Sequence, residues 1–247
     1  MNTSHNTVLV TGGSAGIGFE IARLFSEKGN QVIITGRNKE RLQTAAAQLK
    51  NVTAIVSDVA DEKDRQQLVQ QLKKEFPALN IVVNNAGHAH AYQLLAGADA
   101  ARKAKEEMQT NLFSILSLNE ELLPLLCQQP SAAIVNVSSV VAFVPSRNLP
   151  TYSASKAALH SYTQTLRITL EQTGPVKVFE LMPPLVNTGF SKVIGGEKGI
   201  PPSQVAEALL SGLEKDEYEI RVAGTEQLYQ LYLSSPEQAL VTLNTPL

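Results

Sequence analysis

The sequence predicts a doubly wound α/β fold in a single domain over residues 1–247, with a parallel sheet of about seven strands and helices on both faces. Short β-branched runs alternate with segments whose apolar residues recur at helical spacing. Such alternation favours parallel strands joined by right-handed helical crossovers. No linker rich in Pro, Gly or Ser divides the chain, and its length suits one such domain.

The first unit of this pattern lies at the N-terminus. Residues 7–10 are apolar and β-branched and predict a strand. A glycine-rich turn follows, and then Ile17, Ile21 and Leu24 recur at helical spacing up to about Lys28. Residues 31–35 predict the second strand. In this order the turn precedes a helix N-terminus, where backbone N–H groups can bind a pyrophosphate.

The remaining elements continue the alternation. Further strands are expected over residues 52–57, 81–84, 132–137, 176–181 and 219–222. Helices are expected over residues 41–50, 61–76, 98–127 and 202–215, and around Tyr152. Pro124 predicts a stop or kink near the end of the long helix over residues 98–127. Residues 225–247 predict a helical C-terminal extension.

The composition argues against several classes of protein. A formal net charge of −2 gives no electrostatic case for binding nucleic acid or an anionic membrane. The single cysteine, Cys127, cannot form an intrachain disulfide. The first strand begins near residue 7, which leaves no room for a cleavable signal, and no apolar run is long enough to span a bilayer. The cytoplasm is therefore the expected location.

The glycine-rich turn has the sequence Thr11-Gly12-Gly13-Ser14-Ala15-Gly16-Ile17-Gly18. Glycines let the backbone approach phosphate groups and let the helix pack closely on the strand. The spacing Gly-x-x-x-Gly-x-Gly differs from the commonest dinucleotide fingerprint, Gly-x-Gly-x-x-Gly. Any tight strand-to-helix connection can use glycines, so the turn alone is a weak signal.

Tyr152 and Lys156 stand four residues apart, and Ser139 lies thirteen positions before the tyrosine. On a helix the first two share a face. Lowering a phenol pKa from near 10 to about 7 takes roughly 4 kcal/mol. An ammonium about 4 Å away supplies about that much at an effective dielectric constant of about 20. The pair is therefore a candidate proton donor, although Tyr and Lys also meet at this spacing on ordinary helix surfaces.

Several such motifs occur in one order along residues 11–188. They are the glycine-rich turn, Asp58, Asn84-Asn85-Ala86-Gly87, Asn111, Ser139, Tyr152-(x3)-Lys156 and the segment from Pro183 to Thr188. In combination they resemble the short-chain dehydrogenase/reductase family, in its short single-domain branch with a Rossmann-type sheet. The resemblance implies an oxidoreductase that transfers a hydride between a nicotinamide cofactor and a small carbonyl or alcohol substrate.

The resemblance also implies a catalytic set of Ser139, Tyr152, Lys156 and Asn111. Tyr152 would donate a proton to the substrate oxygen, and Ser139 would stabilise the developing negative charge. Lys156 would bind the nicotinamide ribose and lower the pKa of Tyr152. The backbone carbonyl of Asn111 would anchor a water that links Lys156 to solvent. Ser138 is chemically capable too, but the spacing to the tyrosine favours Ser139.

The end of the second strand bears on the choice of cofactor. An acidic residue there usually marks NAD, because it binds the ribose 2′-hydroxyl. Here Arg37 and Asn38 follow, with no acid before Glu40. A guanidinium can bind a 2′-phosphate in bidentate fashion, so NADP(H) is expected rather than NAD. Alternatively, Arg37 is a solvated loop charge and Asn38 caps the next helix.

Other cofactor contacts follow from the resemblance. The expected cofactor-binding residues are Gly12, Ser14, Gly16, Ile17, Gly18, Arg37, Asn38, Asp58, Val59, Asn84, Ala86, Gly87, Tyr152, Lys156, Pro183, Val186 and Thr188. Asp58 would bind the adenine amino group or serve as a simple turn residue, and Asn84 would brace the sheet beside the adenosine. Pro184 stands where relatives usually have glycine, and a second proline removes a backbone N–H.

Two segments bear on substrate and assembly. Residues 189–200 predict a short substrate lid. The helical C-terminus differs from the glycine-rich final strand of many tetrameric relatives, so a homodimer through the helices carrying Asn111 and Tyr152 is expected, with a tetramer as the alternative. Residues 181–188 also resemble oxidoreductases encoded in some teichoic-acid D-alanylation operons, which implies no particular substrate.

The histidines complete the candidate groups. His5 and His160 have no partner in the sequence. His88 and His90 stand two apart beyond the Asn-Asn-Ala-Gly turn. Without a third ligand motif no metal site is expected, and contact with substrate or cofactor, or a solvated loop, is preferred.

Two other functions compete with an oxidoreductase. A non-catalytic NADP-binding sensor or scaffold of the same fold would have little reason to keep all four residues of the implied catalytic set. A sugar-nucleotide epimerase would need a longer C-terminal substrate domain than this chain provides.

Overall fold

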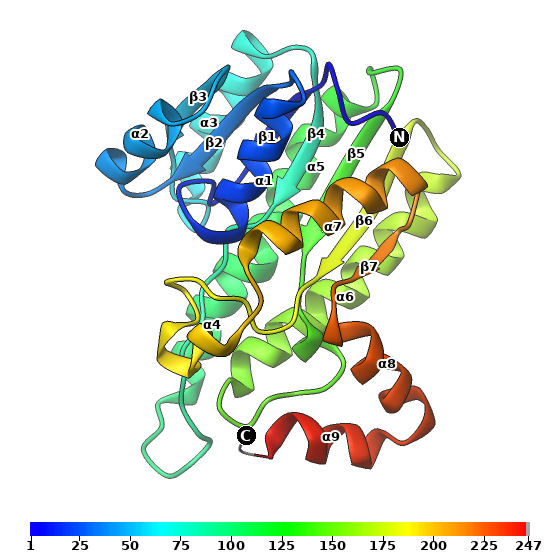
Figure 1. Ribbon diagram of the computed structural model, residues 1–247. Helices are drawn as coiled ribbons and strands as arrows, with labels where there is room; N and C mark the ends of the chain where they lie inside the picture. Colours follow the sequence, from blue (N-terminus) through cyan, green and yellow to red (C-terminus); the bar gives the residue numbers. More distant parts are fainter. Residues whose placement is uncertain (246–247) are drawn as a thin grey trace.

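The computed structural model describes residues 1–245 and contains a seven-stranded parallel sheet in the order β3-β2-β1-β4-β5-β6-β7 (Figure 1). The strands are β1 (Thr7–Val10), β2 (Gln31–Gly36), β3 (Val52–Val56), β4 (Leu79–Asn84), β5 (Ala132–Val137), β6 (Val176–Met182) and β7 (Glu219–Arg221). The predicted fold class is confirmed. The chain runs outward in one direction from β1 to β3 and in the other from β4 to β7, so the crossovers diverge between β1 and β4. That point is where such sheets bind ligands.

Helices cover both faces of the sheet. They are α1 (Gly16–Glu27), α2 (Lys39–Ala47), α3 (Glu62–Glu75), α5 (Ser114–Leu126), α6 (Pro150–Glu171) and α7 (Pro202–Lys215). One core lies between the sheet and α1, α2 and α7, and the other between the sheet and α3, α5 and α6 (Figure 1). Strand side chains alternate between the two cores, as with Val8 and Val10 in the first and Leu9 in the second.

The long helix expected over residues 98–127 is interrupted. It comprises α4 (Ala100–Met108), a π-helical turn η1 (Gln109–Phe113) and α5. The π-turn has Asn111 at its centre, and such turns often occur at functional sites. Pro124 lies in the last turn of α5, which ends at Leu126, so it is near the helix end as expected.

Two C-terminal helices, α8 (Gly224–Ser234) and α9 (Pro236–Asn244), lie beyond the carboxyl ends of the strands rather than on either face (Figure 1). The Asn244 side chain accepts from the Arg147 N–H at 2.7 Å and donates to the Pro145 carbonyl at 3.0 Å. These bonds tie α9 to the segment between β5 and α6. Residues 246–247 of the expected extension lie outside the described residues. Within residues 1–245, no helix has the length and apolar character needed to cross a bilayer.

Candidate active site

A cleft of about 580 Å³ lies at the carboxyl edge of the sheet, at the divergence between β1 and β4. One end contains Arg37 and Asp58, and the other contains Tyr152 and Phe190. All residues that the sequence singled out for catalysis or cofactor binding line this cleft except Asn84 and Asn111. The topology has therefore brought together groups from every part of the chain between residues 12 and 188.

The glycine-rich turn, which precedes α1, forms one part of the cleft wall. Gly12 and Gly16 adopt positive φ angles of +67° and +56°. A Cβ on Gly18 would lie 2.4 Å from Asn85 Nδ2 and 2.5 Å from the Gly12 carbonyl oxygen. No side chain caps the N-terminus of α1, and its first turn has no acidic residue. Backbone N–H groups are thus left for an anion, as a dinucleotide pyrophosphate requires.

Asn85 holds the glycine-rich turn in place, a role that the sequence analysis did not find. Its Nδ2 donates to the Thr11 carbonyl at 2.9 Å, and the Thr11 hydroxyl accepts from the Asn85 and Ala86 N–H groups at 3.0 Å each. Only the fold brings these segments together, because they are more than seventy residues apart.

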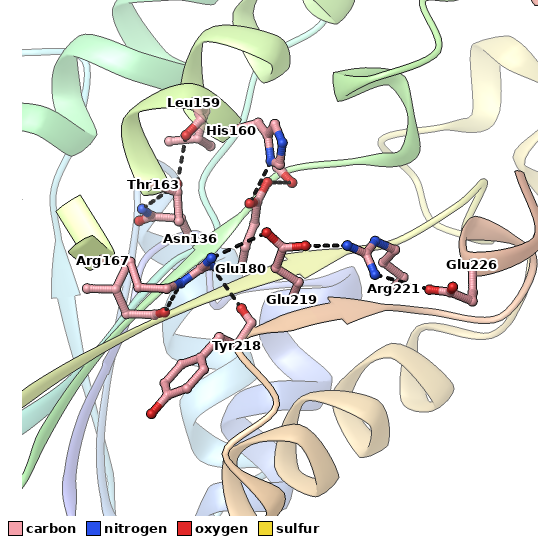
Figure 2. Close-up of polar contacts among 12 residues, drawn as sticks. Asn136, Leu159, His160, Thr163, Arg167, Glu180, Tyr218, Glu219, Arg221 and Glu226 are labelled. Atoms are coloured by element: carbon pink, nitrogen blue, oxygen red, sulfur yellow. Dashed lines mark hydrogen bonds and ion pairs between the residues drawn. The ribbon is translucent and has the colours of Figure 1, made fainter. Parts of the chain in front are cut away.

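Asn84 was expected to contact the cofactor, but it does not line the cleft. Its side chain is buried and donates to Asn119 Oδ1 at 2.9 Å and Asn136 Oδ1 at 2.8 Å. Asn136 in turn donates to the Thr163 hydroxyl at 2.9 Å (Figure 2). As the last residue of β4, Asn84 points into the protein and joins β4 to β5 and α5. It braces the sheet, as expected, and its neighbours Asn85 and Ala86 line the cleft instead.

For the residues after β2, the sequence left open either contacts with a 2′-phosphate or a solvated charge followed by a helix cap. The Asn38 side chain accepts from the Arg41 N–H at 2.8 Å and so caps α2. The Arg37 side chain is 70% exposed. Its Nη1 lies 3.8 Å from Asp58 Oδ2, so the two residues form a loose ion pair. Arg41 also lines the cleft, one helical turn after Arg37. Two guanidinium groups therefore border this end, and only that of Arg37 was expected from the sequence.

Asp58 acts partly as the turn residue considered above. Its Oδ1 accepts from the Ala60 N–H at 2.9 Å, and its own N–H donates to Asp64 Oδ2 at 2.8 Å. The carbonyl of Val59 accepts from Arg65 Nη1 at 2.7 Å. These bonds fix the loop after β3, and Oδ2 of Asp58 is the oxygen nearer to Arg37.

Tyr152 and Lys156 lie in the first two turns of α6, and both are buried. Lys156 Nζ lies 5.6 Å from the centroid of the Tyr152 ring and donates to the Val137 carbonyl at 2.8 Å. Ser139 follows the end of β5 and caps a short 3₁₀ turn, η2 (Val140–Ala142). The three side chains share one end of the cleft.

Burial dominates the electrostatics of this end. It raises the pKa of Tyr152 well above its ordinary value, and the charge of Glu107 raises it further, whereas the Ser139 hydroxyl acts in the opposite direction. Burial also lowers the pKa of Lys156 to about 8, opposed by the charge of Glu180. The expected lowering of the Tyr152 pKa by Lys156 is therefore not seen in the protein alone. The ammonium is bonded to a strand carbonyl instead, and desolvation outweighs its attraction for a phenolate.

Glu180 of β6 is fully buried close to this site. It accepts a hydrogen bond from the Ser138 hydroxyl and pairs with His160 Nδ1 at 2.8 Å (Figure 2). That pairing raises the pKa of His160. His160 thus has a partner that the sequence did not reveal. The Ser138 hydroxyl is therefore engaged with a buried carboxylate, whereas the Ser139 hydroxyl lies beside Tyr152.

Asn111 lies behind the cleft and clamps the segment after β4. Its Oδ1 accepts from the His88 N–H and its Nδ2 donates to the His88 carbonyl, both at 2.8 Å. Nδ2 also donates to the Ser155 hydroxyl at 2.9 Å, which links η1 to α6. The Asn111 side chain therefore positions these segments. This role is separate from the anchoring of a water that the resemblance implies for the Asn111 carbonyl.

The segment after β6 forms the mouth of the cleft. Val186 pairs with Ile200 in an isolated bridge, which closes the residues between them into a loop. Phe190 in this loop is 51% exposed, and its ring centroid lies 6.1 Å from that of Tyr152. Leu243 of α9 also lines the cleft. The sequence did not single out Phe190, although an aromatic residue within the expected lid could have been a signal, and nothing in the sequence linked Leu243 to the site.

Comparison with known proteins identifies the family. The family model described as short chain dehydrogenase matches residues 6–199. The chain is 38% identical to the uncharacterized oxidoreductase DltE of Bacillus subtilis over 99% of each chain, which confirms the closer resemblance noted for residues 181–188. A Burkholderia cenocepacia short chain dehydrogenase in complex with NADP is similar over 100% of both chains, with a TM-score of 0.87 and 25% identity.

A second solved structure shows the same fold with another cofactor. A short chain dehydrogenase/reductase of Burkholderia phymatum in complex with NAD covers 100% of this chain and 98% of its own, with a TM-score of 0.86 and 18% identity. Proteins of this fold thus include complexes with either nicotinamide cofactor. The family match over most of the chain and the full-length relative lead to one conclusion: the protein belongs to the short-chain dehydrogenase family and is an oxidoreductase.

Proposed function

We propose that this oxidoreductase uses NADP(H) to transfer a hydride between nicotinamide and a small carbonyl or alcohol substrate, with Tyr152 as the proton donor and acceptor. The observation that supports this most strongly is the position of Ser139, Tyr152 and Lys156 at one end of a cleft whose other end has an uncapped helix N-terminus and two guanidinium groups. A dinucleotide phosphate has chemical groups that match both ends.

The proposed cofactor site follows from these groups. The pyrophosphate would bind at the glycine-rich turn, where Gly12, Gly16 and Gly18 leave room for it. The 2′-phosphate would bind Arg37, with Arg41 beside it. No carboxylate follows directly on β2 to bind a free 2′-hydroxyl, which favours NADP(H) over NAD.

The chemistry proposed for the site divides among three side chains. When bound, NADPH supplies the hydride. Tyr152 stays protonated at neutral pH because burial raises its pKa, so it can donate to the strongly basic alkoxide that forms from a carbonyl. Ser139 would hydrogen-bond the same oxygen, and Lys156, whose pKa is about 8, keeps most of its positive charge at neutral pH.

We further propose a homodimer in the cytoplasm. Phe113 of η1 and Ile168 of α6 are 51% and 62% exposed, on the elements that carry Asn111 and Tyr152. Both side chains would be covered if the two copies pack through these elements. Light scattering coupled to gel filtration would measure the mass, and a mass of one or four chains would contradict the dimer.

The direct test uses the purified full-length chain. Binding of NADPH and NADH is measured by fluorescence titration, and NADPH oxidation is followed against aldehydes, ketones and small diketones. We expect NADPH to bind at least about tenfold tighter than NADH, and at least one carbonyl to be reduced. Tight NADPH binding without turnover on a broad panel would point to the non-catalytic sensor or scaffold. Tighter binding of NADH would refute the role given to Arg37.

A further inference from the structure

Two histidines and a glutamate meet beside the cleft. His88 and His90 come from the segment after β4, and Glu106 comes from the last turns of α4. His90 Nε2 lies 3.0 Å from His88 Nε2 and 2.7 Å from Glu106 Oε2, and His88 Nε2 lies 3.8 Å from that oxygen. We propose that these three side chains form a binding site for a divalent transition metal ion, with Zn²⁺ as its occupant.

The separations fit a metal centre. Zn²⁺ bonds imidazole nitrogen and carboxylate oxygen at about 2.0–2.1 Å, so tetrahedral ligand atoms lie roughly 3.3 Å apart. The three measured separations of 2.7, 3.0 and 3.8 Å lie around that value. Two imidazoles and one carboxylate are an established zinc ligand set, and three protein ligands leave a coordination position for water.

Hydrogen bonding alone accounts poorly for the cluster. A ring nitrogen has either one proton or one lone pair. His90 Nε2 lies within hydrogen-bond distance of both Glu106 Oε2 and His88 Nε2, so a single N–H would have to be shared between the two acceptors. A central cation resolves this, because each of the three atoms then directs a lone pair at the same point.

The backbone of each histidine is held in place. Asn111 bonds both the N–H and the carbonyl of His88 at 2.8 Å. The N–H of His90 donates to Oε1 of the buried Glu107 at 2.7 Å. These anchors hold the backbone of both histidines beside α4, whose Glu106 contacts the His90 ring. Ligands fixed in this way lose little freedom on binding a metal.

The carboxylate is oriented as well. Arg102, one turn earlier on α4, bonds Glu106 Oε1 at 2.7 Å, which leaves Oε2 toward the imidazoles. Such outer partners commonly orient metal ligands. Glu106 lies sixteen residues after His90, so the third ligand was not visible in the sequence. Since His88 also lines the cleft, a bound ion would join the rim of the cleft to α4.

The test measures metal binding by the chelator-treated full-length protein. Zn²⁺ is titrated in competition with a chromophoric chelator, and one high-affinity ion per chain is expected. Glu106→Gln keeps the shape of the side chain and removes its charge, and should weaken binding at least about tenfold. The double variant His88→Asn/His90→Asn should lose the site. His5→Asn is the matched control, because His5 has a φ of 61°, which asparagine tolerates, and it should bind like the wild type.

A second measurement does not depend on any variant folding. X-ray absorption at the zinc edge of the wild-type complex should show two imidazoles and oxygen ligands in the first shell. Absence of stoichiometric binding by the wild type would overturn the proposal. So would unchanged affinity in the folded Glu106→Gln variant, or a metal shell without two imidazoles. None of these readouts depends on NADPH or on turnover, so the site stands or falls separately from the proposed activity.

Discussion

Lys156 is a charged side chain held in an apolar environment. Burial lowers its pKa from an ordinary 10.5 to about 8. At about 1.4 kcal/mol for each tenfold change in proton affinity, this corresponds to roughly 3 kcal/mol against folding at neutral pH. A residue with a proposed role in the chemistry thus reduces the stability of the fold.

Lys156→Met should therefore stabilise the protein by about 1–3 kcal/mol at pH 7 while abolishing turnover. Urea denaturation of both chains measures the difference. The advantage of the variant should shrink between pH 8 and pH 10.5, because the folded wild type releases the proton there and the unfolded chain keeps it. A variant that is less stable than the wild type at pH 7 would show that the charge is not desolvated as described.

In the proposed cofactor site, Arg37 is the residue that would bind the 2′-phosphate. Arg37→Ala should weaken NADPH binding roughly 10- to 100-fold and leave NADH binding within about twofold, since only the 2′-phosphate loses its partner. Fluorescence titration with each cofactor measures this. Arg23→Ala on the outer face of α1, whose guanidinium pairs with Glu20 and Glu27, is the control. Equal losses for both cofactors would refute a 2′-phosphate contact.

At the scale of elements, the glycine-rich turn and α1 form one unit with the end of β4. Gly18→Ala would place a methyl group against Asn85 Nδ2 and the Gly12 carbonyl. We expect at least about tenfold weaker NADPH binding and a stability loss of about 1–3 kcal/mol. Gly174→Ala is the matched control, because nothing lies within 4 Å of its added Cβ. Wild-type cofactor binding by Gly18→Ala would contradict the close packing described.

The sequence predicted some elements better than others. Strands and helices with clear periodicity, such as β1 and α1, could be placed because local residues determine their buried face. The π-turn at Asn111 could not be placed, and the partners of the Asn111 side chain, His88 and Ser155, are distant in the sequence. The pairing of Asn85 with Thr11 could not be predicted either. The sequence pointed to the neighbouring Asn84 as a cofactor contact instead.

At the scale of the molecule, the order of the sheet explains why distant motifs meet. The carboxyl ends of β1, β4, β5 and β6 lie side by side, so the segments that follow them line one cleft. This much followed from the alternation and motif order in the sequence. Pairs without a sequence signature, such as Glu180 with His160 or Glu106 with His90, required the fold to be known.

The C-terminal helices contribute one wall at the substrate end. Leu243 of α9 packs against the cluster that includes Val140, Leu149 and Tyr152. Truncation after Ser235, which keeps α8, should raise KM for a carbonyl substrate about tenfold or more and leave NADPH affinity within about twofold. Steady-state kinetics and cofactor titration measure the two effects. Weaker NADPH binding with an unchanged KM would show that α9 borders the cofactor end of the cleft and not the substrate end.

The central claim is that the hydroxyl of Tyr152 passes the proton in carbonyl reduction. The most direct measurement compares Tyr152→Phe with the wild type, using the best carbonyl substrate from the panel and NADPH titration in parallel. We predict that kcat falls about 10³-fold or more, because the variant lacks the proposed proton donor, while NADPH affinity stays within about threefold. Turnover within tenfold of the wild type, with the variant folded and NADPH bound, would contradict the account.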